Sequence, residues 1–84
     1  MSAPRIVHQP EQQRFVCETG GAEAVITYRL MGTSVDFNHT YVPHSARGRG
    51  IAALLVEAAA AWARTEGLTI TASCWYAREH LNLA

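Results

Sequence analysis

The spacing of apolar residues changes once along this chain, and the change falls at a short glycine loop. Before the loop, residues 35–42 alternate in the manner of a β-strand, and after it an alanine-rich helical pattern begins at Ile51. Arg47-Gly48-Arg49-Gly50 lies between the two patterns. The sequence therefore predicts a strand, a glycine loop and a helix in direct succession, which places an α/β unit at the centre of the fold.

This loop has the properties of an anion-binding site. Gly48 and Gly50 let the backbone come close to a ligand, because neither residue carries a Cβ atom. The first N–H groups of the following helix have no intrahelical partners, and the positive end of the helix dipole favours negative charge. Arg47 and Arg49 add full charges at the rim of a predicted pyrophosphate site. Loop chemistry alone is equally compatible with a tight turn whose arginines are solvated.

Alternation with a period of two predicts three antiparallel strands in the first half of the chain. The predicted strands cover residues 13–18, 23–30 and 35–41, with glycine-containing turns at residues 19–21 and 31–34. In the third strand, the alternation puts His39 on the same face as Val35 and Phe37.

The second half of the chain is predicted to return over this sheet. Pro43 cannot donate a hydrogen bond to a sheet, so the third strand is expected to end there. Apolar residues at helical spacing predict a helix over residues 51–67. Residues 68–73 alternate as a fourth strand, parallel to the third through a right-handed crossover, and residues 77–83 are predicted to form a short C-terminal helix.

These elements give an α/β (α+β) fold class and one domain. We expect a flexible segment over residues 1–12 and a single domain over residues 13–84, built as a three-strand antiparallel meander, a helix, a parallel strand and a short terminal helix. A chain of 84 residues forms only a small core, so ligand binding or self-association would contribute to its stability. We therefore expect a monomer or a weak homodimer.

Composition narrows the classes of partner. Seven arginines balance seven acids, the chain has no lysine, and nothing in it resembles a nucleic-acid footprint. No apolar run approaches the roughly 20 residues of a membrane helix. The first 13 residues lack the apolar core of a signal peptide, which predicts a cytoplasmic protein. Cys17 and Cys74 are then expected to be free thiols, and the spacing of Cys and His predicts no metal site.

The loop and its flanks resemble the GNAT acetyltransferase superfamily. The acyl-CoA loop of that superfamily reads Gln or Arg, two residues, Gly, one residue, then Gly or Ala, and Arg47, Gly50 and Ala52 fill this pattern. The flanks 37–43 (Phe-Asn-His-Thr-Tyr-Val-Pro) and 72–76 (Ala-Ser-Cys-Trp-Tyr) look like the strand ends of its small single-domain branch. The similarity runs from about residue 15 to about residue 76. A Walker A loop is excluded because no lysine follows the glycines, and a dinucleotide fingerprint because its third glycine is missing.

The resemblance implies where acetyl-CoA binds and which reaction follows. Its pantetheine arm would pair with backbone near Tyr41 and Val42, between the third and fourth strands. Its pyrophosphate would lie on the loop formed by Arg47, Gly48, Arg49, Gly50, Ile51 and Ala52. The implied reaction is transfer of the acetyl group to an amine, by direct attack. Larger members carry further helices and strands that help to build the acceptor pocket, and 84 residues leave no room for them, so the acceptor is not identified.

Three residues are candidates for the catalytic chemistry. His39 could act as the base, since an imidazole titrates near neutral pH, although its predicted face also suits a core histidine. Cys74 is expected at the end of the last strand near the CoA sulfur, either as a bystander, as a nucleophile or as a buried small hydrophobe. Tyr76 could protonate the CoA thiolate, as the resemblance implies. The alternative is a non-catalytic CoA-binding or protein-interaction module.

Overall fold

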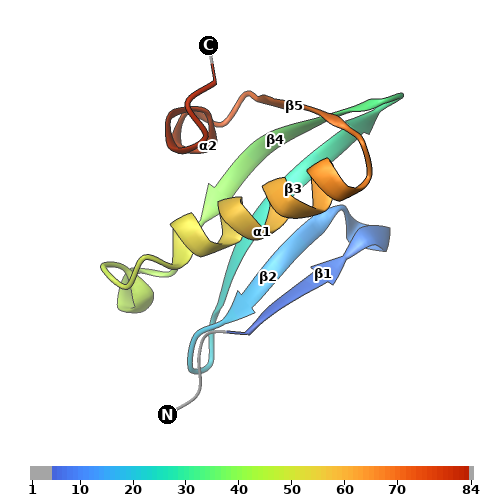
Figure 1. Cartoon of the computed structure of the whole chain (residues 1–84). Helices are drawn as coiled ribbons and strands as arrows, with labels where there is room; N and C mark the ends of the chain where they lie inside the picture. The colour runs from blue at the N-terminus through green and yellow to red at the C-terminus, as the bar shows by residue number, and fades with distance from the viewer. Residues whose placement is uncertain (1–4, 84) are drawn as a thin grey trace.

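The computed structural model describes residues 5–83 of the chain. One sheet contains all five strands in chain order: β1 (Ile6–Gln9), β2 (Arg14–Glu18), β3 (Glu23–Met31), β4 (Ser34–Tyr41) and β5 (Thr69–Ala72). Helix α1 (Ile51–Thr65) lies across one face of this sheet, and the short helix α2 (Trp75–His80) follows the end of β5 (Figure 1). Single turns of 3-10 helix cover Pro10–Gln12 and His44–Ala46.

The meander and the parallel return predicted from the sequence are confirmed. Strands β2, β3 and β4 pair antiparallel, and β4 pairs with β5 in parallel. Helix α1 forms the crossover between these two parallel strands, as a βαβ unit requires. Helix α2 begins at Trp75, earlier than the predicted residue 77.

Strand β1 corrects the expectation of a flexible segment over residues 1–12. Residues 1–4 lie outside the described residues, but Ile6–Gln9 pair antiparallel with β2. The sequence contains no clear signal for this strand, because the half-buried residue that packs on the sheet is a histidine, His8. Its ring stacks on Phe15 at 4.0 Å, and its Nε2 lies 2.7 Å from the hydroxyl of Tyr28.

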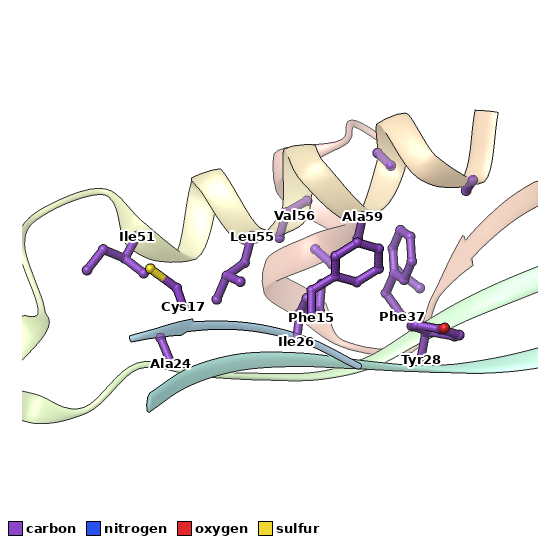
Figure 2. Close-up of a cluster of buried hydrophobic side chains, with 14 of the residues drawn as sticks. Phe15, Cys17, Ala24, Ile26, Tyr28, Phe37, Ile51, Leu55, Val56 and Ala59 are labelled. Carbon is purple, nitrogen blue, oxygen red and sulfur yellow. The ribbon is translucent and has the colours of Figure 1, made fainter. Parts of the chain in front are cut away.

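The core fills the space between α1 and the sheet. Figure 2 shows Leu55 and Ala59 of α1 above Phe15 and Ile26 of the sheet. Small alanines on this face of the helix let it approach the strands closely, and the larger side chains fill the gaps. The helical spacing of the apolar residues Ile51, Leu54, Leu55, Ala58, Ala59 and Trp62 puts Leu54 on the buried face. Leu54 is instead 38% exposed, so the buried stripe is rotated around the helix from the one that this spacing predicts.

A β-bulge in β4 decides which side chains reach the end of the sheet. Tyr28 of β3 pairs with Phe37 while Thr27 pairs with His39, so Asn38 is an extra residue in β4. The extra residue reverses the alternation beyond it. Thr40 consequently faces the side of α1, and His39 faces the opposite side, which we call the outer face of the sheet. The prediction that His39 shares the face of Phe37 was therefore wrong.

Candidate active site

The two parallel strands part at one end and leave a cleft. Their pairing ends with Phe37 opposite Ala72, and the N–H of Cys74 then donates to the carbonyl of Phe37 at 3.0 Å. Strand β4 continues to Tyr41, while the chain after β5 turns into α2. A cleft of about 490 Å³ lies between them. It is lined by Asn38, His39, Thr40, Tyr41, Val42, Arg47, Ala52, Ser73, Cys74, Trp75 and Tyr76.

A second hollow of about 230 Å³ lies against the glycine loop. It is lined by Val42, Ala46, Arg47, Gly48, Gly50, Ile51, Ala52 and Tyr76. Four of these residues also line the cleft, so the two spaces adjoin and share part of their walls. The structure thus brings together the loop and the strand ends that the sequence singled out.

The glycines of the loop are required by its backbone. Gly48 has a φ of 86° and Gly50 a φ of 72°, in the left-handed region that favours glycine. A Cβ atom added at either position would meet no other atom within 4 Å, so it would project into the open space beside the loop. Gly50 directly precedes α1, whose first turn, Ile51 to Leu54, is wholly apolar. The first N–H groups of α1 therefore face this space without a side-chain cap, an arrangement suited to an anion.

The two loop arginines occupy different places. The Nε of Arg47 donates to the carbonyl of Val42 at 3.2 Å, and its side chain lines both the cleft and the hollow. Arg49 is exposed and lines neither space. Sequence reasoning had treated them as equivalent, because spacing alone does not show how the loop turns.

His39 lies on the outer face and reaches the cleft from that side. It is exposed, and it pairs across the strands with Thr27. The neighbouring Asn38 accepts a hydrogen bond from the Thr27 hydroxyl, so the bulge residue points to the same face. His39 is therefore solvent-accessible at the edge of the cleft and is not a core histidine.

Cys74 lies at the junction of β5 and α2 with its sulfur at the cleft wall. Its Sγ is 3.5 Å from the hydroxyl oxygen of Thr40. Partial burial raises the pKa of this thiol, but hydrogen bonds at the sulfur from the backbone of Ala77, the Thr40 hydroxyl and further backbone groups outweigh it and leave the pKa lowered. Cys17 differs, since it is fully buried and burial raises its pKa. Both cysteines are free thiols, as predicted.

Tyr76 is held in place by the packing of α2. Its ring stacks on His80 with centroids 5.9 Å apart, and the His80 Nε2 lies 3.0 Å from a carboxylate oxygen of Glu57 in α1. This contact ties α2 to the helix whose first turn borders the loop. Tyr76 lines both the cleft and the hollow.

Sequence reasoning missed part of the cleft lining. Strict alternation from Phe37 puts Thr40 on the outer face, and the bulge at Asn38 that reverses this leaves no glycine or proline signal. Ser73, whose hydroxyl donates to Asp36, and Trp75 also line the cleft. Only the flanking pattern around Cys74 could have drawn attention to these last two.

Two kinds of feature are absent from the described part of the chain. Within residues 5–83, no group of three or more His, Cys, Asp or Glu side chains is placed so that it could hold a metal ion. Over the same residues, no helix has the length and apolar character needed to cross a membrane.

Comparison with known proteins points to one family. Residues 14–83 match the family model described as GCN5-related N-acetyl-transferase. Protein NATD1 of Xenopus tropicalis is 35% identical over 83 residues, which cover 95% of this chain and 76% of that protein. Protein NATD1 of Homo sapiens is 35% identical over 80 residues, which cover 92% of this chain and 71% of that protein. The NMR structure of a GCN5-like protein from Staphylococcus aureus superimposes with a TM-score of 0.75 at 30% identity, covering 98% of this chain and 81% of that one.

Proposed function

Because this chain belongs to the GCN5-related N-acetyltransferase family, we propose that it binds acetyl-CoA and transfers the acetyl group to an amine. One observation carries the proposal: the loop hollow and the cleft adjoin, with Arg47 and Tyr76 lining both. A ligand with an anionic end, a long polar arm and a reactive sulfur fits two such adjoining spaces. We keep the cytoplasmic location and the monomer or weak homodimer as expectations from the sequence.

The pyrophosphate is proposed to bind to the glycine loop. The free N–H groups at the start of α1 would donate to its oxygens, and the helix dipole would favour its charge. The residues proposed to hold it are Arg47, Gly48, Arg49, Gly50, Ile51 and Ala52. Arg49, which is exposed outside the hollow, would act from the rim through its charge.

The pantetheine arm is proposed to lie along the end of β4. Pairing with β5 stops at Phe37, so the edge of β4 towards the cleft carries no strand partner at Tyr41 or Val42. The Val42 carbonyl already accepts a hydrogen bond from the Nε of Arg47, so the other backbone groups near Tyr41 and Val42 are the ones proposed to pair with the amides of an extended ligand, in the manner of an added strand.

Acyl transfer to an amine needs a neutral attacking nitrogen and a proton for the departing sulfur. We propose that His39, at the outer side of the cleft, accepts the proton of the amine directly or through a water molecule. The hydroxyl of Tyr76 would donate a proton to the sulfur. Cys74 would lie near that sulfur without attacking, and alignment of the two reactants would supply several kcal/mol of the rate enhancement.

Calorimetry with CoA, followed by an acetyl-transfer assay over a panel of amines, tests this proposal. CoA at about a hundred times its Kd should stabilise the folded protein by about 2.7 kcal/mol. The Gly50→Val variant should bind CoA at least about a hundredfold more weakly, because the side chain enters the space beside the loop and strains a φ of 72°. Gly32→Val is the matched control, since Gly32 has a φ of 62° and similarly open surroundings in the turn between β3 and β4, at the opposite end of the sheet.

The outcomes separate the alternatives. If millimolar CoA leaves the heat of mixing and the melting curve of the native protein unchanged, the acetyl-CoA assignment is wrong. Binding of CoA without transfer to any amine would instead support a non-catalytic CoA-binding module.

A further inference from the structure

Trp75 is the most exposed large hydrophobic residue in the described part of the chain. Its side chain is 69% exposed, although it stands on the wall of the cleft. Its ring lies 6.0 Å from that of Tyr76, nearly at a right angle to it. Core packing explains Trp62 but not Trp75. An exposed indole beside a cleft is typical of a surface that contacts a ligand.

Trp75 lines the cleft but not the loop hollow that is proposed to hold the pyrophosphate. Tyr76 and Arg47 line both the cleft and the loop hollow, whereas Trp75 lines the cleft alone. His39 and Tyr41 also line only the cleft, and the bulge in β4 turns both of them to the outer face. We call this part of the cleft, formed by Asn38, His39, Tyr41, Ser73 and Trp75, the outer mouth.

The outer mouth combines two exposed aromatic rings with the candidate base. Tyr41 is 47% exposed, so it and Trp75 both offer apolar surface to a ligand in the cleft that His39 also lines. From these contacts we propose that the outer mouth binds the acyl acceptor, and that the acceptor is a primary amine carried on an aromatic ring that packs on Trp75. This inference rests on the proposed function, since an acceptor site has meaning only beside a bound acyl donor.

Charge at the cleft argues against a polycationic acceptor. The described residues that line it are neutral or basic types and include no Asp or Glu. The nearby carboxylate of Asp36 accepts hydrogen bonds from Thr71 and Ser73, and Ser73 stands between it and the cleft lining. A spermidine-like chain or a lysine-rich peptide would bring several positive charges towards Arg47 without a carboxylate to pair with them. A single amine on an apolar ring avoids this cost.

Kinetics with three probe amines test the acceptor class. With saturating acetyl-CoA, we expect the KM for phenethylamine to lie at least about tenfold below that for butylamine, because only the first has a ring to pack on the indole. Spermidine should be the poorest of the three. Trp75→Ala should raise the KM for phenethylamine about tenfold while the KM for acetyl-CoA stays constant, and Trp75→Phe should restore most of the loss. Met31→Ala is the control, because Met31 is 47% exposed at the far end of β3.

A binding measurement that needs no turnover keeps the two proposals distinguishable. In the CoA-bound protein, phenethylamine should shift the NMR signal of the Trp75 indole N–H, which Trp75→Phe identifies by its disappearance. A shift without turnover would support the acceptor site and contradict the proposal that the protein is an active acetyltransferase. No shift at tens of millimolar phenethylamine, a KM change confined to acetyl-CoA, or a preference for spermidine would each overturn the inference.

Discussion

The sheet is closed beneath α1 and open beyond the last pair of β4 and β5. Beneath α1, side chains such as Cys17, Phe37 and Leu55 have no exposed surface. Beyond Phe37, the same strand carries Tyr41 half exposed at a cleft of about 490 Å³. Two local devices make the difference: one extra residue in β4, which reverses its faces, and a glycine loop, which leaves the start of α1 uncapped. Stability and ligand chemistry are thereby placed in different parts of a very small domain.

The two cysteines give the sharpest contrast between these regions. A thiol-alkylating reagent should modify Cys74 first, because its pKa is lowered and its sulfur lies at the cleft wall, whereas Cys17 is 0% exposed with a raised pKa. Modification of Cys17 requires the fold to open, and an opening free energy of about 4 kcal/mol slows it by about a thousandfold. Mass spectrometry of the labelled protein over time measures both rates. Comparable rates for the two thiols would mean that the region beneath α1 is not closed.

The two tryptophans separate the regions by stability. Trp62→Ala should lower the free energy of unfolding by about 3 kcal/mol, because its ring packs 4.8 Å from both His8 and Tyr28. Trp75→Ala should change it by no more than about 0.5 kcal/mol, since the ring is mostly in water. Denaturant unfolding followed by circular dichroism measures both variants without relying on tryptophan fluorescence. Equal losses would contradict the division into a packed and an open region.

The division into a packed region and an open region also explains which features of the structure could be predicted from the sequence. The three strands of the meander, α1 and β5 were found because their apolar residues repeat with a clear period, and burial beneath a helix enforces that period. The glycine loop was found because positive φ values demand glycine there. Regular elements can be recognised from the spacing of apolar residues, and tight turns from their glycines.

The remaining features have no such signal in the sequence. Strand β1 depends on the stacking of the His8 ring on Phe15, and a histidine in the sequence does not by itself predict such packing. The bulge at Asn38 depends on pairing with another strand, so only the register in space shows that His39 faces outward and Thr40 inward. The lining of the cleft could therefore be predicted at the loop and not at the outer mouth.

We expect His8 to make the stability of the packed region depend on pH. Burial lowers its pKa below the 6.5 of an ordinary histidine, so the unfolded chain takes up a proton at a higher pH than the folded protein does. The stability present above pH 6.5 should therefore be lost progressively as the pH falls below that value, with a drop of a few degrees in the melting temperature. His8→Phe keeps a flat ring against Phe15 and should remove this part of the pH dependence.

His44→Gln is the control for that experiment, because His44 is exposed and does not pack with the rings of Phe15, Tyr28 and Trp62 around His8. Its melting temperature should follow that of the native protein between pH 5 and 7. If His8→Phe retained the full dependence on pH, the titrating group would lie elsewhere.

The smallest effect is expected from Cys74→Ala in the open region. Direct attack by a bound amine needs no thiolate, and the residues proposed to hold acetyl-CoA and to move protons remain in place, so the variant should keep acetyl transfer within about threefold of the native rate. Its affinity for CoA, measured by calorimetry, should also be retained, since the loop and the end of β4 are unchanged. In the opposing mechanism, Cys74 forms an acyl-cysteine before the amine attacks. The lowered pKa of Cys74 is the observation that most favours this mechanism. That route predicts a loss of about a thousandfold, or about 4 kcal/mol of transition-state stabilisation, with CoA affinity intact. The size of the loss therefore decides between a cleft that only aligns two reactants and one that also supplies a nucleophile.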